Sequence, residues 1–264
     1  MSLALHPALR QALRWAGLAL NPRGVLSLPR LPGYITQWRR FRADSPMAVP
    51  FGDSYPCLSD ATAHTGFDPH YFFQAAWLSR RLAESRPGRH TDIGSDVGMI
   101  SVLSAFVPVD FVDFRPIDVE LPGLRPLAGN LTAMTLASGS LSSLSCLHVI
   151  EHVGLGRYGD PLDPRGHEKA ASELVRVLAP GGDLYVSTPV GHERVCFNAH
   201  RVFSHGSMVR LFAPLTLTAF SLVDDRGAFL SAATATQADA CDYGCGLFHF
   251  RKNTVDADIR PSER

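Results

Sequence analysis

The sequence predicts an α/β protein with a mostly parallel sheet, and three adjoining segments near the middle of the chain predict it. Residues 142–149 have the length and apolar content of a buried strand, and residues 183–188 have those of a second strand. Between them, apolar side chains over residues 170–178 recur at helical spacing until a proline and two glycines at 180–182 end the pattern. A strand, a helix and a strand in this order form a βαβ unit, in which the two strands run parallel.

The composition fits one large domain with an extension. The chain has 264 residues, 45% of them hydrophobic and 19% charged, and its formal net charge is zero. This balance argues against nucleic acid as the main partner. Five cysteines without framework spacing indicate reduced thiols and a cytoplasmic protein. We expect a basic N-terminal extension over residues 1–66, a main domain over 67–252 and a flexible tail over 253–264.

The extension is basic and contains one predicted helix. Residues 1–43 include seven arginines and no acidic residue. Apolar side chains recur at helical spacing over residues 3–20, whereas residues 25–60 are rich in proline and are expected to be irregular. The extension either packs on the main domain or makes a peripheral contact with an anionic membrane surface or a lipid-linked substrate.

The other elements of the main domain follow from local patterns. Asp68 and Pro69 have the residue types of a helix start, and Pro87 and Gly88 end that helix. The remaining predicted strands are residues 89–93, 109–114, 124–128, 215–223 and 247–250, and the remaining predicted helices are residues 97–106 and 204–211. The last two strands are expected to form an antiparallel hairpin.

A glycine turn follows the first predicted strand of the main domain, after Asp92. Gly94 and Gly98 let backbone N–H groups approach a ligand, and the following helix adds a partial positive charge at its N-terminus. Asp113 ends the next strand, about twenty residues after the turn, where one carboxylate can accept both hydroxyl hydrogens of a ribose. Each acid alternatively caps a turn or a helix.

The loop after the first strand of the βαβ unit begins with Glu151 and His152. Ligands of parallel sheets bind at the carboxyl ends of the strands, so this loop is expected to line the main pocket. His152 has the chemistry of a general base, and Glu151 that of a catalytic carboxylate. The alternatives are a packed loop histidine and a carboxylate that supports the loop.

Further polar residues of this region are candidates for substrate binding. Arg157, Tyr158 and Asp160 either bind a sugar or a phosphate or lock the loop through arginine–aspartate pairs. Beyond the next strand, His200 is a second candidate base and Arg201 a candidate anion clamp. Cys241, Cys245 and His249 have a spacing that suggests zinc, but the strand pattern there favours ordinary buried thiols, and we expect no metal.

Four motifs of the main domain resemble those of class I S-adenosylmethionine-dependent methyltransferases, over about residues 70–251. They are the Asp-x-Gly motif from Asp92 to Gly98, the acid Asp113, the Gly129–Asn130 pair and the Leu-x-Pro-Gly-Gly run at 178–182. The resemblance implies a Rossmann-like, seven-stranded, mostly parallel sheet in the order 3-2-1-4-5-7-6, with helices on both faces. It also implies S-adenosylmethionine as the cofactor, bound by Asp92, Gly94, Ser95, Gly98, Asp113, Asn130 and His148.

The run from Glu151 to Pro161 is similar to the signature of a small, largely uncharacterised methyltransferase-like family. The resemblance implies methyl transfer to oxygen or nitrogen of a small or saccharide-like acceptor, and it leaves the oligomeric state open. Two residues depart from the superfamily pattern: Asp96 stands where a glycine is usual, and Asn130 replaces an acid. They motivate the alternative hypothesis of a catalytically inactive, methyltransferase-like binding module.

Overall fold

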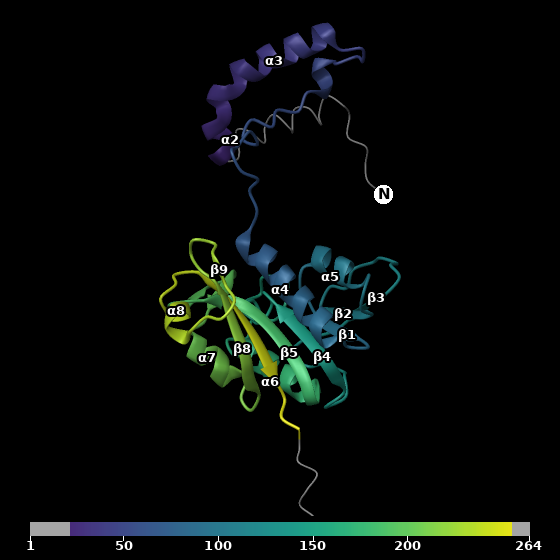
Figure 1. Ribbon diagram of the computed structural model, residues 1–264, viewed down its shortest axis with the longest axis vertical. Coiled ribbons are helices and arrows are strands. Elements are labelled where there is room, and N and C mark those ends of the chain that lie inside the picture. Colours follow the sequence, from purple (N-terminus) through teal and green to yellow (C-terminus); the bar gives the residue numbers. More distant parts are fainter. Residues whose placement is uncertain (1–21, 255–264) are drawn as a thin grey trace, which may run out of the picture. The chain divides into compact units, whose positions relative to one another are not determined.

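The chain divides into two compact units, Met1–Gly66 and Phe67–Arg264. In the computed structural model, shown in Figure 1, residues 22–254 are described. The predicted helix over residues 3–20 and all but the first two residues of the predicted tail lie outside the described residues.

The first unit is more helical than its sequence suggests. It contains the helices α2 (Pro22–Ser27) and α3 (Leu31–Asp44) and the short 3₁₀ turns η1 (Leu28–Arg30) and η2 (Phe51–Asp53). The expectation that residues 25–60 are irregular is therefore wrong. Pro32 lies in the first turn of α3, where its missing N–H removes no hydrogen bond, and no later proline interrupts the helix. Trp38 of α3 packs edge-on against Phe51, with ring centroids 5.3 Å apart.

The second unit is built on one mixed sheet, and its α/β class with parallel central strands is confirmed. The parallel strands are β1 (His90–Ile93), β2 (Val109–Asp113), β3 (Leu124–Ala128), β4 (Leu141–Leu147) and β5 (Leu178–Val190). Strands β10 (Gly244–Arg251) and β8 (Thr216–Val223) are antiparallel; β10 lies between β5 and β8. All parallel strands thus end at one edge of the sheet.

The predicted strand count is wrong, because the sheet has eight strands in the order β3-β2-β1-β4-β5-β10-β8-β9. This order differs from the predicted one by the edge strand β9, which is added outside the seven predicted strands. A turn that includes Gly227 reverses the chain after β8, so that β9 (Phe229–Leu230) pairs with the outer edge of β8. The segments β6 (Arg194–Cys196) and β7 (His200–Val202) form a separate antiparallel hairpin. Neither pairing has a distinct sequence pattern, because each involves only two or three residues per strand.

Helices cover both faces of the sheet, and each face has its own apolar core. On one face, α4 (Pro69–Ser85) and α5 (Val97–Leu103) pack on side chains such as Phe111 and Leu247. On the other, α6 (Gly166–Val177), α7 (His205–Leu211) and α8 (Ala235–Asp239) pack on side chains such as Val186 and Phe250. Because both faces are buried, a ligand is expected to bind at the carboxyl ends of the parallel strands.

Among residues 22–254, no helix is both long and apolar enough to cross a membrane. All five cysteines are free thiols.

Candidate functional site

A cavity of about 340 Å³ opens at the carboxyl ends of β1, β2 and β4. Its volume is in the range of small-molecule sites. Five of the seven residues predicted to bind the cofactor line it: Gly94, Ser95, Asp113, Asn130 and His148. The loop after β4 contributes His152, Tyr158 and Asp160 to the same cavity. The loop therefore lies where the sequence places it, while the roles of its residues stay predictions.

Asp92 lies beneath the cavity rather than in its wall. Its carboxylate is fully buried and accepts hydrogen bonds from the backbone N of Ser95 (3.0 Å) and from the hydroxyls of Ser95 (2.8 Å) and Ser145. Burial raises the pKa of Asp92 to about 6. With both oxygens engaged inside the protein, Asp92 holds the glycine turn in place and does not contact a ligand directly.

The hydrogen bonds around Asp92 continue to His90 and fix its tautomer. Ser145 donates its hydroxyl hydrogen to Asp92, so its oxygen accepts from Nε2 of His90, 2.8 Å away. Nδ1 of His90 then accepts from the hydroxyl of Ser143, also at 2.8 Å. We call these five residues, His90, Asp92, Ser95, Ser143 and Ser145, the β1 network.

Gly94 and Asp113 meet at one end of the cavity. Gly94 has a φ of 64°, a conformation that glycine adopts without strain. A Cβ at this position would lie 3.4 Å from Oδ2 of Asp113. Oδ1 of Asp113 accepts from the backbone N of Arg115 at 2.6 Å, which orients the carboxylate.

Asp96 caps helix α5 and does not line the cavity. Its Oδ1 accepts from the backbone N of Met99 at 2.8 Å. Because the carboxylate bonds the helix N-terminus, it does not crowd the cavity, but it does offset the partial positive charge there. Gly98, in the same first turn, is exposed and also lies outside the cavity lining.

Asn130 lines the cavity, but its carbonyl oxygen is used within its own turn. Oδ1 accepts from the backbone N of Thr132 (2.9 Å) and from its hydroxyl (2.8 Å). A carbonyl oxygen has two lone pairs, so this one has no capacity left for an adenine amino group. Asn130 therefore lines the cavity without offering Oδ1 to a ligand.

The loop after β4 is held by interactions that place its polar side chains. Gly154 has a φ of 81°, and a Cβ there would lie 2.0 Å from the carbonyl oxygen of Asp163. Asp160 accepts from the backbone N of Gly154 at 2.7 Å. Arg201 of β7 is buried and donates to the carbonyl oxygens of Val153 (2.7 Å) and Glu151 (3.3 Å). Arg201 is thus a clamp on the loop backbone and not an anion clamp.

His152 has the geometry of a base whose tautomer is set. Its Nδ1 lies 2.5 Å from the carbonyl oxygen of Ala199, which can only accept, so Nδ1 carries the hydrogen. The lone pair of the neutral ring is then on Nε2. Burial holds the pKa of His152 below its usual range, which favours the neutral ring near pH 7.

The ring of Tyr158 lines the cavity and contacts two arginines. The guanidinium carbon of Arg115 lies 4.7 Å from the ring centroid, and that of Arg157 lies 5.1 Å away. Arg115 lines the cavity, and Arg157 lies outside its lining. Sequence reasoning missed Arg115; its place two residues after the acid that ends β2 was the available signal.

His148 and Glu151, which we call the β4 pair, lie directly after β4. Nδ1 of His148 donates to Oε1 of Glu151 at 2.7 Å. Nε2 of His148 and Oε2 of Glu151 are buried and have no hydrogen-bond partner among the described residues. His148 has a φ of 53°, an uncommon conformation for a residue with a side chain. Glu151 is fully buried and outside the cavity lining, so it acts through His148 rather than on a ligand.

His200, the second candidate base, also lies outside the lining of the cavity. Its ring contacts that of Tyr243, with centroids 5.0 Å apart. The structure therefore brings together eight of the fourteen predicted site residues in the cavity, and the other six are Asp92, Gly98, Glu151, Arg157, His200 and Arg201.

Comparisons with known proteins support the fold and leave the activity open. Residues 135–241 match a family described as Caenorhabditis protein of unknown function, DUF268. The curated protein sequences contain no match to this chain. The solved structures similar to it include the [4+2]-cyclase SpnF, at 14% identity and a TM-score of 0.52 over 84% of this chain and 94% of SpnF.

Two further solved structures are similar at a lower TM-score of 0.49, each at 14% identity. N-methyltransferase NodS from Bradyrhizobium japonicum WM9, in complex with S-adenosyl-L-homocysteine, matches 82% of this chain and 97% of its own. The YcgJ protein of Bacillus subtilis matches 70% of this chain and all of its own. At such identities the likeness extends to the fold alone.

Proposed function

We propose that this chain is an S-adenosylmethionine-dependent methyltransferase that acts on oxygen or nitrogen of a small or saccharide-like acceptor. The observation that carries the proposal is the pairing of Gly94 with Oδ2 of Asp113 in a cavity that also contains His152. A carboxylate at the end of β2 can accept hydrogen bonds from both hydroxyls of a ribose. The glycine turn after β1 lets backbone N–H groups come close to the same ligand. These groups fit the nucleoside part of the cofactor.

S-adenosylmethionine, when bound, supplies a methyl group on a sulfonium that is already activated for transfer. The tasks left to the protein are to align the acceptor and to take its proton. In this proposal Nε2 of His152 takes the proton, because its Nδ1 is held by Ala199 and its ring is neutral. Tyr158 and the neighbouring Arg115 bind a sugar hydroxyl or a phosphate of the acceptor in this proposal.

A second candidate function is a methyltransferase-like module that binds a ligand without methyl transfer. The turn of Asn130 favours it, since the carbonyl oxygen is already used. SpnF, a [4+2]-cyclase of similar fold, illustrates that this fold is compatible with another reaction.

Calorimetry with S-adenosylmethionine and S-adenosylhomocysteine tests the cofactor assignment. Asp113→Ala removes up to two charge-assisted hydrogen bonds, so the affinity should fall at least tenfold, by about 1.5–3 kcal/mol for each bond. Asp118→Ala, at an exposed aspartate outside the cavity, is the matched control and should bind like the wild type. Equal binding by a folded Asp113→Ala protein would remove Asp113 from the site.

Methyl transfer itself is tested by a screen of cell extracts with methyl-labelled cofactor. If the protein labels an acceptor, His152→Gln should keep cofactor affinity and lose about 100-fold or more in turnover. His192→Gln, at an exposed histidine, is the control. Cofactor binding without labelling of any extract would favour the binding module.

The proposed membrane contact of the N-terminal unit rests on α3. It exposes Arg39, Arg40 and Arg42 together with Phe41, which is 67% exposed. Co-sedimentation with anionic vesicles should be strong at low salt and should weaken steeply as salt is added. Absence of sedimentation at low salt would rule this contact out.

A further inference from the structure

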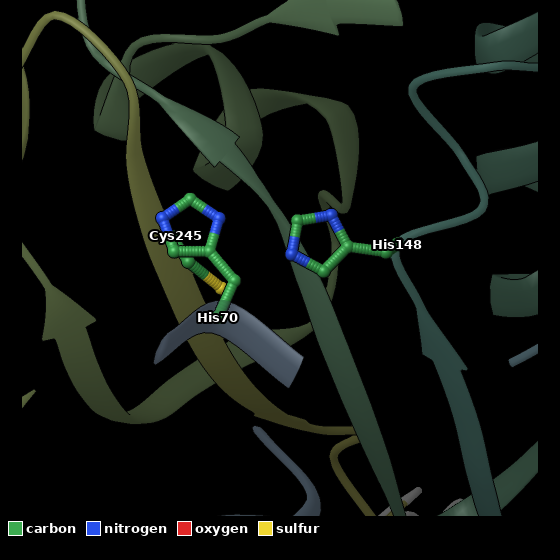
Figure 2. A group of neighbouring side chains, drawn as sticks. All are labelled: His70, His148 and Cys245. Carbon is green, nitrogen blue, oxygen red and sulfur yellow. The ribbon is translucent and has the colours of Figure 1, made fainter. Parts of the chain in front are cut away.

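Three metal-ligating side chains converge beside the cavity, from three separate elements. They are His70 in the first turn of α4, His148 after β4 and Cys245 on β10. One ligand atom from each lies within 4.8 Å of the other two. Figure 2 shows the His148 ring with one nitrogen turned toward His70 and Cys245. The spacing pattern considered in the sequence, with Cys241 and His249, does not form this group.

A second, independent observation concerns one nitrogen atom of this cluster. The side chain of His148 is only 7% exposed, and its Nε2 is buried without a hydrogen-bond partner among residues 22–254. Its Nδ1 donates to Glu151, so Nε2 is the nitrogen that gives up its proton and offers a lone pair when a metal ion binds. A carboxylate on one nitrogen and a metal on the other is the usual arrangement around a metal-ligating histidine.

We propose that His70, His148 and Cys245 form a binding site for a divalent metal ion of the Zn²⁺ type, with Glu151 orienting His148. Two imidazoles and a thiolate are ligands that zinc prefers, and three protein ligands leave a fourth position open. Alkaline-earth ions prefer oxygen ligands and are disfavoured here. This inference rests on the side-chain cluster alone and does not depend on the proposed methyl transfer.

Charge balance supports an ion at this position. Glu151 is a fully buried acid, and Cys245 is buried as well. The ion brings two positive charges, while the Cys245 thiolate and the Glu151 carboxylate bring one negative charge each. The ion and the four side chains are then neutral together, which avoids the cost of an uncompensated charge in the interior. The thiol proton is released to solvent when the sulfur binds the ion.

The cluster has to tighten when the ion binds. Tetrahedral zinc holds neighbouring nitrogen and sulfur ligands about 3.3–3.8 Å apart, as its bond lengths require, so the 4.8 Å spread closes by about 1 Å. The rings of His70 and His148 are now stacked, with 10° between their planes and centroids 5.6 Å apart. Since a bound ion lies in the plane of each ring, the rings must tilt out of this stack.

The site would act at the wall of the cavity, because His148 belongs to both. An ion with an open position can polarise an oxygen or a sulfur of a bound molecule. Tyr71 stacks on His148 with centroids 5.5 Å apart, and Tyr243 stacks on His70 at the same distance. These rings pack against the two histidines of the cluster.

The test uses Zn²⁺ and Co²⁺ alone, with the full-length protein freed of metal by a chelator and kept reduced. Calorimetry should give one Zn²⁺ per chain. Co²⁺ should give the intense visible bands of a tetrahedral site and a thiolate-to-metal charge-transfer band. Cys245→Ser should abolish the charge-transfer band, and His70→Gln should weaken Co²⁺ affinity at least tenfold. Glu151→Gln should weaken it 10- to 100-fold.

Matched controls separate this cluster from other thiols and histidines. Cys241→Ser, at a buried cysteine four residues away in sequence, and His192→Gln, at an exposed histidine, should bind Co²⁺ like the wild type. A wild-type protein without a thiolate band in excess Co²⁺ would overturn the proposal, as would a band that survives in a folded Cys245→Ser. If that variant does not fold, unchanged affinity in His70→Gln overturns it. None of these readouts involves the cofactor or an acceptor.

Discussion

The β1 network joins β1 to β4, and the β4 pair lies directly after β4, yet the two groups differ in how their polar atoms are used. In the β1 network, both oxygens of Asp92 and both ring nitrogens of His90 have hydrogen-bond partners. In the β4 pair, Nε2 of His148 and Oε2 of Glu151 have none among the described residues. Both groups are buried, so their difference is not one of solvent access.

This difference separates a structural role from a functional one. A buried polar atom without a partner costs about 1–3 kcal/mol, so the presence of two such atoms in one hydrogen-bonded pair points to a role beyond stability. A fully bonded network, in contrast, stabilises the strand ends that it connects. We therefore expect substitutions in the β1 network to affect folding, and substitutions in the β4 pair to affect ligand binding.

The largest expected effect is that of Ser145→Val, in the middle of the β1 network. The substitution removes a hydroxyl that bonds both Asp92 and His90, so the buried acid loses one of its three hydrogen bonds and Nε2 of the buried His90 ring loses its partner. The free energy of unfolding, measured with urea, should fall by about 3–5 kcal/mol. Ser172→Val, at an exposed position of α6, is the control and should change it by less than about 1 kcal/mol. A small loss at Ser145 would contradict the structural role of the network.

Gly154→Ala should have the next largest effect, because this glycine shapes the loop that carries the β4 pair. The new Cβ would lie 2.0 Å from a backbone carbonyl oxygen, so the loop has to move. Gly159→Ala is the matched control: its φ of 85° is similar, but nothing lies within 4 Å of its Cβ. Gly159→Ala should cost about 1–2 kcal/mol of unfolding free energy, and Gly154→Ala more than that. Equal losses would show that the loop accommodates the methyl group.

The fold class of the main domain could be predicted from the sequence because its helix and strand patterns extend over many residues. Helix α4 has the predicted Asp68 cap, which accepts from His70 and Tyr71, and the βαβ unit around α6 repeats its apolar residues over several turns. The hairpin β6–β7 and the edge strand β9 could not be predicted, because a pair of two or three residues has no period. In α3, the proline content suggested irregular structure, although Pro32 stands where a helix tolerates it.

The sequence indicated which segments form the candidate site, but not which atoms of their side chains are free to bind a ligand. Strand ends indicated Asp113 and His152, and the resemblance to methyltransferases indicated His148; all three line one cavity. Arg201 was expected to bind an anion, and its carbonyl partners come from a loop about fifty residues earlier in the chain. His70 had no local signal at all, since its neighbours His148 and Cys245 are distant in sequence. Contacts of this range depend on tertiary packing, which composition and spacing do not encode.

A smaller effect is expected from pH, and it sharpens the view of the β1 network. Burial lowers the pKa of His90 to about 3, so the stability it contributes is present above pH 6.5 and is lost as the pH falls toward 3. Burial raises the pKa of Asp92 to about 6, so its contribution is present below pH 3.8 and is lost as the pH rises through 6. Between pH 7 and pH 5 the two trends oppose each other.

Asp92→Asn therefore removes one of two compensating trends. On going from pH 7 to pH 5, the variant should lose about 1.5 kcal/mol more unfolding free energy than the wild type, because only the His90 contribution remains. Urea unfolding of both proteins at the two pH values measures this difference. Parallel pH profiles would mean that the ionisation of Asp92 is not coupled to folding.

The smallest effect on stability is expected for Glu151→Gln, although this residue is as buried as Asp92. The amide keeps an acceptor oxygen for Nδ1 of His148, and it replaces an oxygen that has no hydrogen-bond partner among the described residues. It also removes a buried charge, so the free energy of unfolding should change by less than about 1 kcal/mol in urea. A loss of about 3–5 kcal/mol, like that expected for Ser145→Val, would place Glu151 in a structural network after all. A stable Glu151→Gln protein with weakened Co²⁺ binding would instead assign the β4 pair to a ligand.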